Sequence, residues 1–118
     1  MASDGRDTDE PFEPLAGMTV YWLALKTRGP TWAPGESLEL ERLQAAHLTH
    51  LDEMRVQGLA LISGPLLDGG YLRGVTILRV ASRAEAVAIC EADPSVQAGR
   101  LSYELHPWMV HQGILEPE

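Results

Sequence analysis

Cysteine is nearly absent from the sequence, because Cys90 is the only one in 118 residues. A single cysteine excludes an internal disulfide and a cysteine-based zinc site, and it is typical of a reducing compartment. No stretch approaches the ~18 consecutive apolar residues that a membrane-spanning helix requires. The N-terminus also lacks the basic region followed by an apolar region that marks a secretory signal. We therefore expect a soluble cytoplasmic protein with no membrane partner.

Basic residues are also scarce. The chain has 9 Lys and Arg against 17 Asp and Glu, which gives a net charge of −8. No cluster of Lys and Arg is present to neutralise phosphates, so we expect no nucleic-acid partner. The sequence lacks a Gly-rich phosphate loop, a dinucleotide fingerprint and a nucleophile elbow. These absences predict a protein that works without a cofactor.

The length fits one domain with a real core. Residues 1–17 are acidic, contain proline and show no periodicity, which predicts a disordered extension; an interaction tail is the alternative. Residues 18–108 carry the periodic segments and form the folded domain. Residues 109–118 form a C-terminal tail, and the apolar Ile114 and Leu115 suggest that this tail docks on the domain.

The central stretch of the chain predicts a helix followed by a strand. Ser37 is a suitable N-cap, acidic residues occupy the first turn, and Gly58 is a natural stop. Residues placed about 100° apart form one apolar stripe along this helix. The stripe consists of Leu40, Leu43, Leu51 and Met54. His47 lies in the middle of the stripe, and His50 lies at its edge.

Flanking segments complete a β-α-β-β-α-β order. Strands are predicted at 18–26, 59–63, 72–80 and 101–107, with a second helix at 82–92. The Asp-Gly-Gly sequence at 68–70 predicts a turn between the second and third strands. This order predicts an α+β, ferredoxin-like fold with a four-stranded antiparallel sheet and both helices on one face. The first strand is apolar on both faces, so a second copy of the chain is the simplest cover for the open face, and we expect a homodimer.

His47 requires a partner, since an unsatisfied buried imidazole costs about 1–3 kcal/mol. Asp93 can supply a carboxylate if the end of the second helix lies beside the middle of the first. Such a pair fixes the imidazole tautomer and suits general acid–base chemistry at neutral pH. The alternative is a core histidine bonded to a carbonyl, with Asp93 serving only to turn the Asp-Pro step.

Other polar residues suggest weaker hypotheses. His47 and His50 could share a metal, but Asp68, His106 and His111 are only conceivable third ligands, so we predict no metal. Arg73 and Arg79 could hold an anionic substrate, although exposed strand arginines are commoner. Ser63 is a possible pocket hydroxyl. Trp32, on the Pro/Gly loop 27–36, packs down as a lid or contacts a partner. Cys90 is expected as a small core residue.

A set of ordered short motifs resembles the YCII-related family. The motifs are His47-Leu48 with Leu51, Gly64-Pro65 seventeen residues after His47, Gly74, Glu85-Ala86, Asp93-Pro94, Gly99 and Trp108. The resemblance covers roughly residues 18–108 and implies a small dimeric α/β-barrel protein, of the same broad class as muconolactone isomerase. It also implies that His47 and Asp93 form a catalytic dyad. The chain departs from the family at Ser95, where an aromatic residue is usual, and in its longer loop 27–36 and N-terminal extension.

Two functions are consistent with the sequence. The first is a cofactor-independent lyase or isomerase that acts on a small aromatic, lactone or carbonyl metabolite. In it, His47 is the acid–base, Asp93 orients His47, and Arg73, Ser63 and Trp32 shape the pocket. The resemblance implies dehydrochlorination of a chlorinated aromatic or isomerisation of a lactone as the reactions to expect. The second is a non-catalytic dimeric module that binds a metabolite or a partner protein.

Overall fold

The computed structural model describes residues 12–116 of the chain. In chain order the elements are β1 (Met18–Arg28), α1 (Leu38–Val56), β2 (Ala60–Pro65), β3 (Leu72–Leu78), α2 (Arg83–Glu91), α3 (Pro94–Gln97) and β4 (Leu101–His111). The predicted element order is confirmed. The short helix α3, which begins at the proline of the Asp-Pro step, was not expected.

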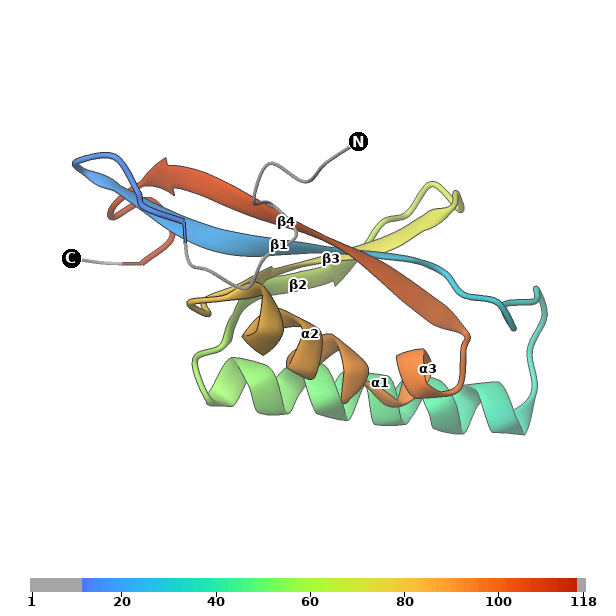
Figure 1. Ribbon diagram of the computed structural model, residues 1–118. Coiled ribbons are helices and arrows are strands. Elements are labelled where there is room, and N and C mark those ends of the chain that lie inside the picture. Colours follow the sequence, from blue (N-terminus) through green and yellow to red (C-terminus); the bar gives the residue numbers. More distant parts are fainter. Residues whose placement is uncertain (1–11, 117–118) are drawn as a thin grey trace.

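The four strands form one sheet in the order β2-β3-β1-β4, and every neighbouring pair is antiparallel. This order is that of the ferredoxin-like fold, so the predicted fold class is confirmed. All three helices lie on the same side of the sheet (Figure 1). Within residues 12–116, no helix is long and apolar enough to cross a membrane.

Helix α1 begins and ends where its sequence predicts. The Ser37 Oγ accepts a hydrogen bond of 3.1 Å from the Leu40 amide, and Gly58 after the helix has a φ of +77°. Glycine adopts this left-handed conformation without a steric penalty. The helix is turned slightly from the predicted stripe, because His50 rather than His47 is its most buried residue. Hydrophobic periodicity alone does not determine how the helix is rotated about its axis, because that rotation depends on which side chains of the sheet the helix packs against.

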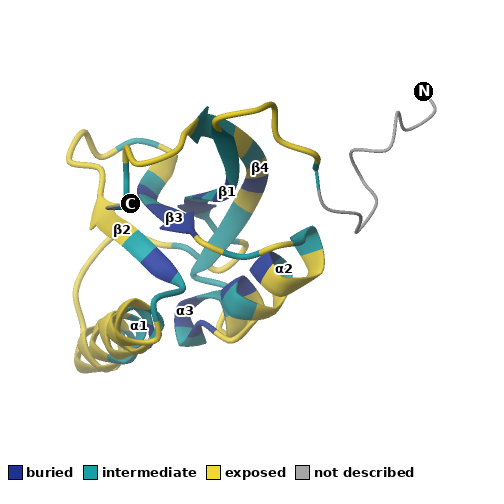
Figure 2. Cartoon of the chain, turned by 90° about the vertical axis from the view of Figure 1, so that its left-hand side faces the viewer, coloured by how far each residue is buried: buried dark blue, intermediate teal, exposed yellow. Residues whose placement is uncertain are grey.

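The core lies between the sheet and the helices. Its buried members are Trp22, Ala24, Ala60, Leu78, Ala86, Cys90 and Leu105. The buried segments of β1, β2 and α2 face this interior (Figure 2). The ring of Phe12 meets that of Trp22 edge-on, with centroids 6.0 Å apart. Phe12 is thus partly buried against the core, although it belongs to the segment 1–17 that we expect to be disordered. Residues 1–11 of that segment lie outside the described residues, and its disorder stays a prediction.

The C-terminal end of the chain continues the sheet. Strand β4 runs to His111, which pairs with Met18, so residues 109–111 belong to the sheet rather than to the predicted tail. After a turn, the chain folds back, and the Glu116 carboxylate accepts a hydrogen bond of 2.6 Å from the Tyr21 hydroxyl. This contact joins the end of the chain to its first strand.

The opposite face of the sheet presents apolar side chains. Leu23 and Leu25 of β1 are partly exposed there, and in the neighbouring strands Ile62 is 55% exposed and Trp108 is 43% exposed. None of the described helices covers this face (Figure 1). The prediction that the first strand has two apolar faces therefore agrees with the structure, whereas the partner copy that we expected to cover one of them stays a prediction.

Candidate functional site

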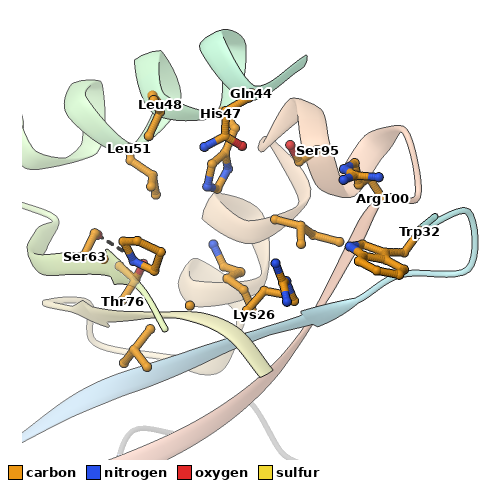
Figure 3. A pocket seen from close by; sticks show the side chains of 16 residues that line it. Lys26, Trp32, Gln44, His47, Leu48, Leu51, Ser63, Thr76, Ser95 and Arg100 are labelled. Atoms are coloured by element: carbon orange, nitrogen blue, oxygen red, sulfur yellow. Dashed lines mark hydrogen bonds between the residues drawn. The ribbon is translucent and has the colours of Figure 1, made fainter. Parts of the chain in front are cut away.

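A cavity of about 280 Å³ lies between α1 and the sheet. Helix α1 contributes Gln44, His47, Leu48 and Leu51, which are spaced at i, i+3, i+4 and i+7 and so share one helical face. The sheet forms the opposite wall, and the loop after β1 and the segment after α3 close one end (Figure 3). Four of the residues predicted for the site, namely Trp32, His47, Ser63 and Arg73, line this cavity.

The structure brings His47 and Asp93 together across 46 residues. The Nδ1 atom of His47 lies 2.7 Å from Oδ2 of Asp93. The Asp93 side chain is fully buried, while the His47 side chain is 12% exposed and points into the cavity (Figure 3). The imidazole therefore lies between the buried carboxylate and the space that a ligand would occupy.

Asp93 uses its two oxygens for two tasks. Oδ1 accepts a hydrogen bond of 2.9 Å from the Ser95 amide and caps α3, while Oδ2 faces His47. Burial raises the pKa of Asp93, but the hydrogen bond and charge of His47, the Ser95 amide and Lys26 outweigh burial and leave the pKa below its ordinary value. Asp93 is therefore an ionised acceptor, and Nδ1 of His47 carries the proton that they share. The two alternatives for Asp93, capping and pairing, hold at the same time.

Lys26 is the third charged group at this position. Its Nζ lies 3.7 Å from Oδ2 of Asp93, and its side chain is 7% exposed. Lys26 also lines the cavity, so it connects the buried carboxylate to the floor of the site (Figure 3). It sits where β1 pairs with Gly74 of β3 on one side and Tyr103 of β4 on the other.

A pair of hydroxyl groups occupies one wall. Ser63 of β2 is in register with Thr76 of β3, and the Ser63 Oγ donates a hydrogen bond of 3.1 Å to the Thr76 Oγ1. Both residues line the cavity. The predicted pocket hydroxyl is thus part of a pair whose strand register fixes its position.

Trp32 lies at the opposite end of the cavity beside arginines (Figure 3). The guanidinium carbons of Arg73 and Arg100 lie 5.7 and 5.6 Å from the centroid of the indole ring. Of the two arginines that we considered for anion binding, only Arg73 is at the cavity. Arg79 follows β3 at its other end, where it donates to the Gly58 carbonyl and lies 3.5 Å from Glu116.

The fold does not bring the conceivable metal ligands of the described residues together. Among residues 12–116, no three His, Cys, Asp or Glu side chains gather as a metal site. Asp68 accepts a hydrogen bond from the Gly70 amide in the hairpin turn, and His106 lies 3.6 Å from Glu104. His50 is buried on α1 and lines a small internal cavity together with Cys90.

Sequence reasoning missed Lys26, Arg100 and Thr76 as residues of this cavity. Lys26 carried a usable signal, since a lysine ending an apolar strand that is buried on both faces requires a charged partner. Arg100 carried none, because its place depends on how the loop 27–36 lies against the segment after α3. There, the Gly29 amide donates to the Arg100 carbonyl and the Thr31 amide donates to the Gly99 carbonyl.

Comparisons with known proteins agree with this fold. A solved structure of 5-chloro-2-hydroxyhydroquinone dehydrochlorinase from Burkholderia phenoliruptrix AC1100, in complex with 2,5-dihydroxybenzoquinone, is similar to the chain with a TM-score of 0.55 and 23% sequence identity. The match covers 76% of this chain and 93% of the dehydrochlorinase. No curated protein sequence matches the chain. The family model of the YCII-related domain matches residues 21–109. The resemblance noted in the sequence is thereby confirmed, and the chain belongs to the YCII-related family.

Proposed function

We propose that this protein is a small cofactor-independent lyase or isomerase that uses His47 as a general acid–base and Asp93 to orient it. The observation that carries the proposal is the 2.7 Å contact between His47 Nδ1 and a buried Asp93 oxygen at the wall of a cavity. A carboxylate that holds Nδ1–H leaves the Nε2 lone pair for the substrate. The substrate is a small aromatic, lactone or carbonyl compound.

The proposed chemistry is a proton transfer beside a carbonyl. Nε2 of His47 takes a proton from carbon, and the electrons of the broken C–H bond move toward the carbonyl oxygen. The imidazolium that forms is stabilised by the negative charge of Asp93. The same proton then returns to a different atom in an isomerisation, whereas in an elimination the electrons expel a leaving group such as chloride.

Lys26 has a position that suits the charge formed in this step. Its ammonium group lies on the cavity floor beside Asp93, within the same buried cluster. A fixed positive charge close to the developing oxyanion lowers the energy of the transition state more than that of the neutral substrate. We assign Lys26 this electrostatic role.

The similar solved structure belongs to a dehydrochlorinase that binds a dihydroxybenzoquinone. That likeness supports an elimination from a hydroxylated or quinone-like ring as the first reaction to test. The cavity accepts such a ring, because Leu48, Leu51 and Pro65 provide apolar walls around the polar groups.

We also propose that the active form is a homodimer joined through the open face of the sheet. The partly exposed Leu23, Leu25, Ile62 and Trp108 support this assembly, since apolar side chains on a sheet face without helices gain from a second sheet. Sedimentation equilibrium measures the molecular mass of the assembly in solution. A dimer that Ile62→Lys converts to a monomer would support this interface, and a monomeric wild type would contradict it.

The decisive experiment combines turnover with an NMR titration of His47. We expect His47→Asn to abolish dehydrochlorination of a chlorinated hydroxyhydroquinone, and Asp93→Asn to shift the His47 titration. His111→Asn is the matched control, because His111 is exposed at the end of β4 and does not line the cavity. An unchanged His47 titration in Asp93→Asn would overturn the dyad. Ligand binding without turnover of any tested substrate would favour a non-catalytic binding module.

A further inference from the structure

Three arginines surround the indole ring of Trp32. The guanidinium carbon of Arg28 lies 4.1 Å from the ring centroid, and those of Arg73 and Arg100 lie within 6 Å. Arg28 is the last residue of β1, Arg73 lies on β3, and Arg100 directly precedes β4. Three segments distant in sequence therefore place positive charge at one end of the cavity.

None of these arginines is in an ion pair with another residue of the described range 12–116. Each guanidinium instead donates to a main-chain carbonyl. The acceptors are Gly69 for Arg28, Gly70 for Arg73 and Ala33 for Arg100. Neutral acceptors hold the side chains in place without cancelling their charge.

The surrounding cavity has the same electrostatic character. Among the described residues that line it, Arg73 and Arg100 are cationic without an ion pair, Lys26 is paired with the buried Asp93, and none is Asp or Glu. The chain as a whole carries a net charge of −8, so this concentration of positive charge is opposite to the average of the protein. Guanidinium groups gathered around one indole ring repel each other, and an anionic ligand would relieve that repulsion.

The polar groups are arranged along the cavity in order. Trp32 and Arg100 lie at one end, Ser63 and Thr76 lie at the other, and His47 and Lys26 lie between them (Figure 3). Guanidinium groups bind carboxylate and phosphate oxygens with two parallel hydrogen bonds. Hydroxyl groups suit an uncharged carbonyl or hydroxyl.

We propose that the substrate is an organic acid whose oxyanion, a carboxylate or a phosphate, binds between Arg73 and Arg100 beside Trp32. The uncharged end of the molecule then reaches the Ser63–Thr76 pair, and the carbon between the two ends faces His47. The position of this reacting carbon rests on the proposed acid–base function. The oxyanion subsite itself stands on the arginines and can be tested without turnover.

Benzoate and benzamide form a matched pair of probes, because they have the same shape and differ in charge. NMR titration of the Trp32 indole N–H, assigned with Trp32→Phe, measures their dissociation constants. We expect benzoate to bind at least about tenfold more tightly than benzamide, since hydrogen bonds to a charged group are the stronger ones. Phenyl phosphate is titrated in parallel, and the tighter of the two anions identifies the group that the subsite prefers. Equal binding of benzoate and benzamide would overturn the proposal.

Variants then locate the anion. We expect Arg100→Gln and Arg73→Gln each to weaken binding of the preferred anion by about tenfold, whereas the binding of benzamide stays unchanged. Arg100→Lys keeps the positive charge and should lose less affinity for the anion than Arg100→Gln. This variant separates the loss of charge from a disturbance of the loop. Arg42→Gln removes an exposed positive charge from α1 outside the cavity and is the matched control. An unchanged affinity in both Gln variants would place the anion elsewhere and overturn the proposal.

His47→Asn separates this proposal from the catalytic one. Anion binding that persists in His47→Asn supports the arginine subsite whether or not the wild type turns over any substrate. Anion binding that disappears in His47→Asn, while both arginine variants bind normally, would assign the oxyanion to the imidazole and overturn the subsite. If only the catalytic proposal is wrong, the wild type binds the anion through the arginines but turns over no substrate.

Discussion

The Lys26 ammonium lies 3.7 Å from Asp93 Oδ2, the same oxygen that faces His47 Nδ1. One buried carboxylate therefore interacts with two partners on two different elements, β1 and α1. Removing the carboxylate would leave the ammonium group buried without an opposite charge, and such a loss is strongly destabilising. The dyad is thus a structural element of the core as well as a candidate catalytic group.

Asp93→Asn should lower the free energy of unfolding at pH 7 by about 3 kcal/mol. The pKa of Asp93 is below its ordinary value of 3.8 in the folded protein, so its stabilisation is present above that value and is lost as the pH falls through the lower, folded pKa. The difference between wild type and variant should therefore shrink below about pH 3.8. Urea unfolding at several pH values measures it.

Asp52→Asn is the control for this experiment. Asp52 pairs with Arg55 on the exposed surface of α1, and such a pair contributes at most about 1 kcal/mol. A wild type and an Asp93→Asn variant of equal stability at pH 7 would show that the cluster does not stabilise the fold.

Gly29→Ala should disturb the loop that carries Trp32. A Cβ at residue 29 would overlap the main-chain carbonyl of Gly99 and press on the main-chain carbon of Leu101. Main-chain atoms cannot rotate away as the end of a flexible side chain can. We expect a loss of about 1–3 kcal/mol in stability and a shifted Trp32 indole signal. Gly70→Ala is the control, since its nearest atom would be an Asp68 oxygen at an ordinary 3.5 Å. A Gly29→Ala protein with the melting temperature and indole signal of wild type would contradict the packing.

Cys90 should react slowly in the folded protein. Burial raises the pKa of its thiol from 9.0 to about 11, and the reactive thiolate is then a minor species at pH 8. We expect its reaction with a disulfide reagent at pH 8 to be at least about a hundredfold slower than in guanidinium-unfolded protein. The prediction fails if the native thiol is labelled at the rate of the unfolded one.

Tyr21 reports on the C-terminal end of the chain. Burial and the hydrogen bond to Glu116 raise the pKa of Tyr21 to about 12. A raised pKa stabilises the fold below the ordinary value of 10.0, and this stabilisation is lost as the pH rises toward 12. In Glu116→Gln, the phenolic absorbance should titrate at a lower pH than in wild type. Glu104→Gln, an exposed carboxylate on β4, should leave the titration of Tyr21 unchanged.

Local signals in the sequence determined the elements of this fold. The Ser37 cap, the stop at Gly58, the Asp-Gly-Gly turn and the Asp-Pro step each act within a few residues, so they can be recognised without knowing the rest of the structure. The order of the elements then limited the sheet to few topologies. The pairing of His47 with Asp93 was expected from the family resemblance, whereas the local pattern by itself favoured a capping role for Asp93.

Tertiary structure alone decided which side chains share the cavity. The rotation of α1 that buries His50, the place of Lys26 beside Asp93 and the meeting of three arginines at Trp32 all depend on segments far apart in the chain. The continuation of β4 to His111 and the return of Glu116 to Tyr21 have the same origin. Packing and electrostatic contacts act only between groups that the fold has already brought close, and for that reason sequence spacing could name His47, Arg73 and Trp32 but could not place Arg100 beside them.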